Sequence, residues 1–315
     1  MLHRSELQLT TCVLDIEGPV ATITIRAPRS LPDGTAGHHW ELGEIFSRLR
    51  GDTSVRAVVV TGEANEFYVP MRAAFYGTQA AHGYLVNPAG SWRTAVGIVR
   101  FNQEVAEIEK PVIAKVNGNA IGFGSTIAFA CDLIVAREDA IFCDTHLAMD
   151  EREDLKALPA NVSSDTPSSP PAGIVPGDGA VSVVQAFFSP AMAKEYLMLA
   201  RPFTGADLAA SGAINEAVPH SNLDDTVDQL VERLIERSAF ALAWTKRTTN
   251  RGVADEINRE PRNASVEPTP QAIEPVTSRV GLKVRQNELR SAIDAELQRP
   301  DGQREVEATV VEIQP

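Results

Sequence analysis

The chain has 315 residues, 43% of them hydrophobic, and a formal net charge of −13 at pH 7. This length suffices for one large core with surface decorations, or for two small cores. Nucleic acid is excluded as an expected partner, because an acidic chain without a basic stripe repels phosphates.

The cysteines and the apolar runs indicate a cytoplasmic protein. Its three cysteines, Cys12, Cys131 and Cys143, cannot all pair and lack the spacing of a zinc site, so we expect reduced core residues and no metal. No apolar stretch approaches the roughly 18 residues of a membrane span, and residues 1–15 lack the apolar centre of a signal peptide. We therefore expect no membrane partner.

The first hundred residues alternate between strand and helix patterns. Period-two alternation and helical periodicity predict a hairpin at 12–26, a helix at 39–50, a strand at 55–62 and a helix at 91–108. This recurrence is typical of stacked turns that share one interior.

Residues 110–136 contain the most informative pattern of the chain. A β-branched strand at 112–116 turns through Asn117-Gly118-Asn119 into a small-residue helix at 122–130, and a second buried strand follows at 133–136. A strand that enters a helix through glycines presents free backbone N–H groups at the positive helix terminus. Such groups can stabilise an anionic oxygen while bonds beside a carbonyl form or break.

The chain after residue 180 has mainly helical patterns. Helices are expected at 180–187, 191–200, 204–212, 223–238 and 240–250, and a short strand at 213–218. Thr204 and Asp207 have the spacing of a helix start, and Gly212 suits the helix end. Two stretches rich in charge, Ser and Pro, 151–171 and 259–278, are predicted to be surface insertions, with a last helix at about 281–297.

The stretch KPVIAKVNGNAIGFGSTIAFACDLIVA at 110–136 closely resembles the signature of the crotonase (enoyl-CoA hydratase/isomerase) superfamily, with weaker similarity from about 12 to 250. The resemblance implies an α/β crotonase (ClpP/crotonase-like) fold, a spiral of ββα turns with a C-terminal helical region, and assembly into a homotrimer or a dimer of trimers. Its implied divisions are a spiral core at 1–186 with a polar insertion at 151–171, a helical cap and oligomerisation region at 187–258, a flexible insertion at 259–278, and a terminal helix and tail at 279–315.

Three departures from the superfamily pattern affect the expected chemistry. Phe123 replaces the middle glycine of the signature, Thr126 replaces an acidic residue, and His146 occupies a second acidic position. Hydratases of the superfamily use two carboxyl groups for the water and its proton, so these replacements argue against standard hydration.

Locally the chain is similar to β-diketone hydrolases of the 6-oxocamphor hydrolase type, which cleave a carbon–carbon bond without coenzyme A. The similarity lies in His146 after Phe142, in AGIVPGDG at 172–179, and in HHWEL at 38–42. It implies that His146 is the general base, Asp178 its orienting carboxylate, and His39 a substrate contact or proton donor. A histidine with a pKa near neutrality suits this task.

Each of these residues also has a structural interpretation. His146 could be a satisfied buried polar group, Asp178 could cap the helix at 180–187, and His39 could be a solvated helix-start histidine. Asp144 is either a second carboxylate beside the histidine or a plain strand-end residue.

The oxyanion hole and the substrate pocket follow from the same resemblance. The backbone N–H groups of Met71 and Phe123 match the two family donors, although Pro70 replaces a glycine and 67–72 could be only a strand end. Weaker pocket candidates are Trp40, Tyr68, Thr126 and Asp144.

Three functions follow as hypotheses. The first is cofactor-independent hydrolysis of a cyclic β-diketone by water activated by the His–Asp pair, with the enolate in the oxyanion hole. The alternative is a hydratase- or isomerase-like reaction on a substrate presented as a CoA thioester. The third is a non-catalytic crotonase-fold scaffold.

Overall fold

The structure, a computed structural model, describes residues 9–26, 37–68, 88–146 and 176–264. The chain divides into two compact units, Met1–Pro268 and Thr269–Pro315, and every described residue lies in the first. The predicted insertion 151–171 and the predicted helix at 281–297 fall outside the described residues, so both stay predictions.

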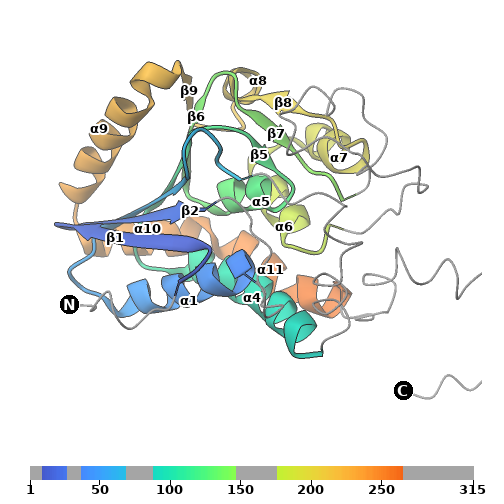
Figure 1. Ribbon diagram of the computed structural model, residues 1–315, viewed down its shortest axis with the longest axis horizontal. Helices are drawn as coiled ribbons and strands as arrows, with labels where there is room; N and C mark the ends of the chain where they lie inside the picture. The colour runs from blue at the N-terminus through green and yellow to red at the C-terminus, as the bar shows by residue number, and fades with distance from the viewer. Residues whose placement is uncertain (1–8, 27–36, 69–87, 147–175, 265–315) are drawn as a thin grey trace, which may run out of the picture. The chain divides into compact units, whose positions relative to one another are not determined.

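A six-stranded sheet forms the centre of the fold (Figure 1). In spatial order its strands are β1 (Cys12–Glu17), β2 (Val20–Ile25), β3 (Ala57–Gly62), β4 (Val112–Val116), β6 (Leu133–Arg137) and β9 (Glu216–Val218). The β1–β2 pair is the predicted antiparallel hairpin, and the other neighbours pair in parallel. A second sheet contains β5 (Ala120–Ile121), β7 (Ile141–Cys143) and β8 (Phe203–Thr204).

Helices cover both faces of the large sheet. They are α1 (Gly37–Gly51), α4 (Pro88–Glu107), α5 (Phe123–Ala130), α6 (Ala180–Phe187), α7 (Pro190–Met198), α8 (Gly205–Ser211), the short 3-10 helix η3 (His220–Asn222), α9 (Leu223–Ile235), α10 (Ala239–Thr249) and α11 (Arg251–Ala264). Figure 1 shows α9 on one side of the sheet, with α1 and α4 on the other. Alternation along β3 explains this, because Val58 and Val60 belong to the main core whereas Val59 packs with Val227 and Val231 of α9.

The C-terminal end of α11 differs from the sequence prediction. The insertion expected from residue 259 begins inside α11, which continues through Pro261 to Ala264. The charged composition and the proline favoured a loop, but Val253 and Ile257 pack this helix against the core. Tertiary contacts therefore outweigh the local preference.

Three segments far apart in sequence meet at the first turn of α5. The Tyr68 N–H donates to the carbonyl of Asn119 (2.9 Å), and the Tyr68 carbonyl accepts from Ile121 (2.9 Å). Gly122 then donates to the carbonyl of Cys143 at the end of β7 (2.8 Å). Gly122 has a φ of +57°, a left-handed conformation that glycine adopts without strain. The ends of β5 and β7 and the start of α5 are thus brought together.

Candidate active site

His146 is fixed by the carboxylate two residues before it. Its Nδ1 lies 3.1 Å from Oδ1 and 3.0 Å from Oδ2 of Asp144, and its backbone N–H donates to Asp144 Oδ1 (3.0 Å). Asp144 follows β7 and is fully buried, whereas the His146 side chain keeps 21% of its surface exposed. The imidazole is therefore oriented from its Nδ1 side, and part of it stays accessible.

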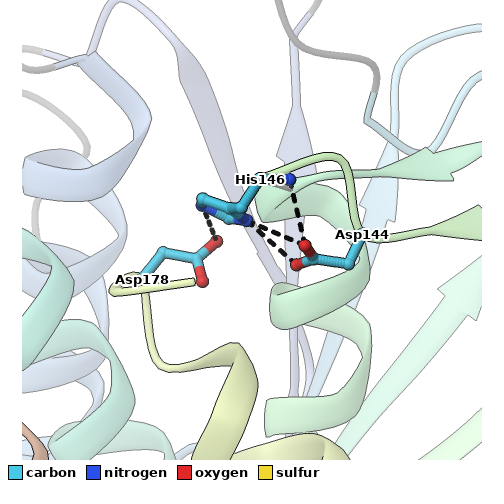
Figure 2. Close-up of side chains that lie close together, drawn as sticks. All are labelled: Asp144, His146 and Asp178. Carbon is cyan, nitrogen blue, oxygen red and sulfur yellow. Dashed lines mark hydrogen bonds and ion pairs between the residues drawn. The ribbon is translucent and has the colours of Figure 1, made fainter. Parts of the chain in front are cut away.

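Asp178 approaches the same imidazole from the other side, as Figure 2 shows. Its Oδ2 lies 3.8 Å from His146 Nε2, an ion-pair distance that is longer than a hydrogen bond. The buried carboxylate also accepts hydrogen bonds from Thr126 Oγ1 (2.9 Å) and from the N–H of Ala180 (3.1 Å). The sequence resemblance gave the orienting position to Asp178, but Asp144 holds Nδ1 and Asp178 faces Nε2.

The contact with Ala180 also bears on the structural interpretation of Asp178. Asp178 binds the first N–H of α6, as the capping interpretation expected, and simultaneously faces His146. The two interpretations are compatible because each uses a different carboxylate oxygen. Asp144 is likewise more than a strand-end residue, since both of its oxygens contact His146.

The two carboxylates determine the charge of the imidazole. Burial alone would lower the pKa of His146, but the charge of Asp178, together with the hydrogen bond and charge of Asp144, raises it to about 9. Burial raises the pKa of Asp178, and the charge of Asp144 acts in the same direction, while His146 and Thr126 oppose the rise. At neutral pH His146 is an imidazolium that can donate a proton.

Histidine and carboxylate groups at this spacing can also surround a cation, since one ligand atom from each of Asp144, His146 and Asp178 lies within 4.8 Å of the others. Here Nδ1 contacts the carboxylate of Asp144 and is therefore not open to a cation.

The candidate oxyanion donor Phe123 is the first residue of α5. Its N–H belongs to the first turn, where a helix supplies no acceptor of its own. Its ring is buried and stacks on His39 at 4.1 Å between centroids, with Tyr68 edge-on at 6.0 Å. The second expected donor, Met71, lies outside the described residues.

His39 and Trp40 lie on α1. His39 stacks on Phe123 and so lies beside the start of α5, and the guanidinium of Arg100 lies 5.9 Å from the Trp40 ring centroid. The neighbouring His38 has a structural environment: it is buried, its Nε2 lies 2.9 Å from the Arg26 carbonyl, and burial lowers its pKa. Both adjacent histidines contact a candidate site residue: His39 stacks on Phe123, and the His38 ring lies edge-on to Tyr68 with centroids 5.1 Å apart.

One residue of this region escaped sequence reasoning. Asn102, in the middle of α4, donates to the backbone carbonyl of Asp178 (2.9 Å) and is 2% exposed. No motif surrounds it, so only its position in the helical periodicity marks it as inward-facing.

Comparison with known proteins identifies the family. The family model described as enoyl-CoA hydratase/isomerase matches residues 15–149 and 161–272. The chain belongs to the enoyl-CoA hydratase/isomerase family. The crotonase fold predicted from residues 110–136 is thereby confirmed.

Individual family members are similar over most of the chain. A short-chain-enoyl-CoA hydratase of Clostridium acetobutylicum is 24% identical over 252 residues, covering 80% of this chain and 85% of its own. A carnitinyl-CoA dehydratase of Citrobacter koseri is 28% identical over 262 residues, covering 81% and 87%. The solved structure of an enoyl-CoA hydratase/isomerase from Mycobacterium paratuberculosis has the same fold, with a TM-score of 0.67, 20% identity, and coverage of 86% of this chain and 100% of its own.

In the part of the chain that the structure describes, no helix combines the length and apolar character needed to cross a bilayer.

Proposed function

We propose that the protein catalyses addition or elimination of water at the α,β-bond of a CoA thioester. The observation that carries the proposal is the His146 imidazole between two buried carboxylates, one of which accepts a hydrogen bond from Thr126 of α5. The named relatives act on enoyl-CoA and carnitinyl-CoA substrates, which supports this reaction class better than the hydrolytic cleavage expected first from sequence.

The thioester oxygen is the atom that gains charge in this reaction. Water addition at the β-carbon turns the thioester into an enolate, whose oxygen would accept hydrogen bonds from the N–H groups of Phe123 and Met71. Donors placed where charge develops stabilise a transition state by several kcal/mol in total, since one donor contributes roughly 3 kcal/mol. The positive end of α5 adds to the effect.

The protons can be balanced between His146 and Asp178. The Asp178 carboxylate takes a proton from water as the oxygen attacks the β-carbon, and the His146 imidazolium gives a proton to the α-carbon as the enolate collapses. Transfer of a proton from Asp178 to His146 Nε2, across the present 3.8 Å, restores both groups. Elimination runs through the same steps in reverse.

Asp144 and Thr126 support this division of roles. Asp144 keeps Nδ1 protonated and turns Nε2 toward Asp178, while Thr126 donates to the reactive oxygen of Asp178. Thr126 thus occupies an acidic position of the family pattern and contacts a carboxylate supplied by another segment.

The test is turnover of short-chain enoyl-CoA thioesters by the wild type and two variants. We expect His146→Gln and Asp178→Asn each to lower kcat by roughly 100-fold or more, because a positioned acid or base contributes that factor. Asp139→Asn is the matched control, since Asp139 pairs with Arg137 and its side chain is 64% exposed. Equal turnover by all four proteins would contradict the proposal, as would failure of CoA thioesters to raise the melting temperature.

Hydrolysis of a β-diketone is the second candidate. It is favoured by the contact between His146 and Asp178, which the hydrolase-like motif predicted across the 147–175 segment. Here neutral His146 takes a proton from water, the hydroxyl bonds to one carbonyl carbon, and the adjacent C–C bond breaks to leave an enolate that is then protonated. Incubation with cyclic β-diketones and mass spectrometry would detect a product heavier by one water.

We further propose a homotrimer or a dimer of trimers, on the family resemblance. Two large apolar side chains of α10, Phe240 and Trp244, are 73% and 55% exposed and contact each other with ring centroids 6.2 Å apart. Exposed aromatic pairs of this kind are typical of protein interfaces. If the protein assembles but turns over neither enoyl-CoA thioesters nor cyclic β-diketones, the hypothesis of a non-catalytic crotonase-fold scaffold would remain.

A further inference from the structure

Asp178 depends on contacts from other elements for its position. It lies in the turn 177–179 before α6, and its carboxylate contacts Thr126 and Ala180. These two hydrogen bonds constrain the carboxylate only if the peptide that carries it is also fixed. The backbone contact of that peptide comes from α4.

Asn102 provides the backbone contact with both protons of its amide. Nδ2 donates to the carbonyl of Asp178 (2.9 Å) and to the carbonyl of Ile98 one turn earlier in α4 (3.0 Å). The bond to Ile98 fixes the Asn102 amide relative to α4. The bond to the Asp178 carbonyl therefore holds the Asp178 peptide at a fixed distance from α4. Of the side chains close to asparagine in size, neither aspartate nor leucine offers two N–H donors.

Gly179 makes this approach possible. It has a φ of +98°, and a Cβ at this position would lie only 2.5 Å from Asn102 Nδ2. The absence of a side chain therefore lets the amide reach the 178–179 peptide. Asn102 Oδ1 is buried and accepts no hydrogen bond within the described part of the chain, so the two donated bonds are what hold the side chain there.

We propose that Asn102 is a positioning residue that holds Asp178 at its distance from His146. Its catalytic meaning rests on the function proposed above. Loss of the contact lets the 178–179 peptide rotate and the carboxylate move away from Nε2.

The charge of His146 reports this movement without any assay of activity. Asp178 raises the pKa of His146, so an Asp178 displaced from Nε2 lowers it toward the ordinary 6.5. The other carboxylate on the imidazole, Asp144, is held by its own contacts in the 144–146 turn. Tyr196 of α7 is a further titratable group near these carboxylates. Burial raises its pKa, and the charges of Asp144 and Asp178 raise it further, so Tyr196 stays neutral.

The experiment is NMR titration of 13C-labelled histidine in the full chain, with His146 assigned by its loss in His146→Gln. Asn102→Leu is expected to lower the measured pKa of His146 by at least about one pH unit, in the direction of Asp178→Asn. Gly179→Ala should act in the same direction from the other side of the contact. Asn102→Ser, which offers a single donor, is the milder variant if Asn102→Leu does not fold.

Asn117→Leu is the matched control. Asn117 is also buried and donates to two carbonyls, those of Gly62 and Ala64, at 2.9 and 2.8 Å. Its loss should lower the melting temperature and leave the pKa of His146 unchanged.

The results separate this inference from the proposed function. If Asp178→Asn lowers the pKa of His146 but Asn102→Leu and Asn102→Ser leave it at the wild-type value, Asn102 has only a structural role. If Asn102→Leu shifts the pKa while Asp178→Asn retains full turnover, the positioning role stands and the assigned reaction is wrong. If the positioning role of Asn102 and the proposed reaction are both correct, Asn102→Leu should lower kcat roughly tenfold with little change in KM.

Discussion

His146 keeps a positive charge because carboxylates from two separate segments face its two ring nitrogens. Asp144 and His146 both follow β7, whereas Asp178 lies in the turn before α6, more than thirty residues later. The family pattern places carboxylates at positions 126 and 146, whereas here the buried carboxylates that face the imidazole are those of Asp144 and Asp178.

Substitution of Thr126 shows how far the charge of Asp178 depends on a hydrogen bond from one neutral donor. The Thr126 hydroxyl lowers the pKa of Asp178, so Thr126→Val should raise that pKa further and leave a smaller fraction of Asp178 as the carboxylate ion that accepts the proton. A hydrogen bond to a charged group contributes about 1.5–3 kcal/mol, so kcat/KM should fall roughly tenfold or more. Thr126→Ser, which keeps the hydroxyl, should retain most activity. A fully active Thr126→Val would show that this bond has no catalytic importance.

The candidate site was partly predictable residue by residue. His146 and Asp178 each stand in a contiguous motif, so pattern comparison could propose that they pair. In the structure His146 Nε2 and Asp178 Oδ2 lie 3.8 Å apart, longer than the hydrogen bond that the motif implied. The hydrogen bond from His146 to Asp144 could not be predicted, because a strand-end carboxylate has many local partners available to it. Asn102 was missed because its partner is a backbone carbonyl from another segment, which no spacing along the sequence encodes.

At the scale of elements, α10 is joined to the signature segment by a buried ion pair. Lys246 donates to Asp132 Oδ2 (2.7 Å) and to the Lys110 carbonyl (3.1 Å), and Asp132 also accepts from Val112 N–H and from Asn250. Burial lowers the pKa of Lys246, and Asp132 opposes the change. The aspartate that follows the small-residue helix in the family signature therefore has a structural role here.

Removal of this lysine should be costly. Lys246→Met leaves a mostly buried carboxylate without its cation, and the free energy of unfolding should fall by about 3 kcal/mol in a denaturant titration. Lys115→Met removes a cation whose partner Asp224 is 77% exposed and should cost less than about 1 kcal/mol. Equal losses for the two variants would mean that the buried pair contributes no more than a surface one.

Elements with strong local signals were predicted well. Thr204 and Asp207 form the capping box of α8, and Gly212 ends that helix with a φ of +76°. The end of α11 was not predictable, since the packing of Ile257 outweighs the helix-breaking tendency of Pro261. Local chemistry determines where α8 begins and ends, whereas a tertiary contact determines where α11 ends.

At the scale of the whole molecule, assembly should depend on α10. Replacing both exposed aromatics, Phe240→Glu with Trp244→Glu, places two charges in an apolar patch and should shift the proposed trimer toward monomer in analytical ultracentrifugation. Met198→Glu, at a residue of α7 that is 66% exposed, is the matched control for added charge. An unchanged sedimentation mass in the double variant would exclude this patch from the interface.

The central claim is that His146 acts as the acid between two carboxylates, and the pH dependence of kcat/KM on an enoyl-CoA thioester tests it most directly. With the pKa of His146 at about 9, the protonated form predominates below that pH. The account predicts a rate that falls about tenfold per pH unit above 9, because the donor is then lost. A rate that instead rises with pH up to about 9 would show that neutral His146 is the active form, and would contradict the account.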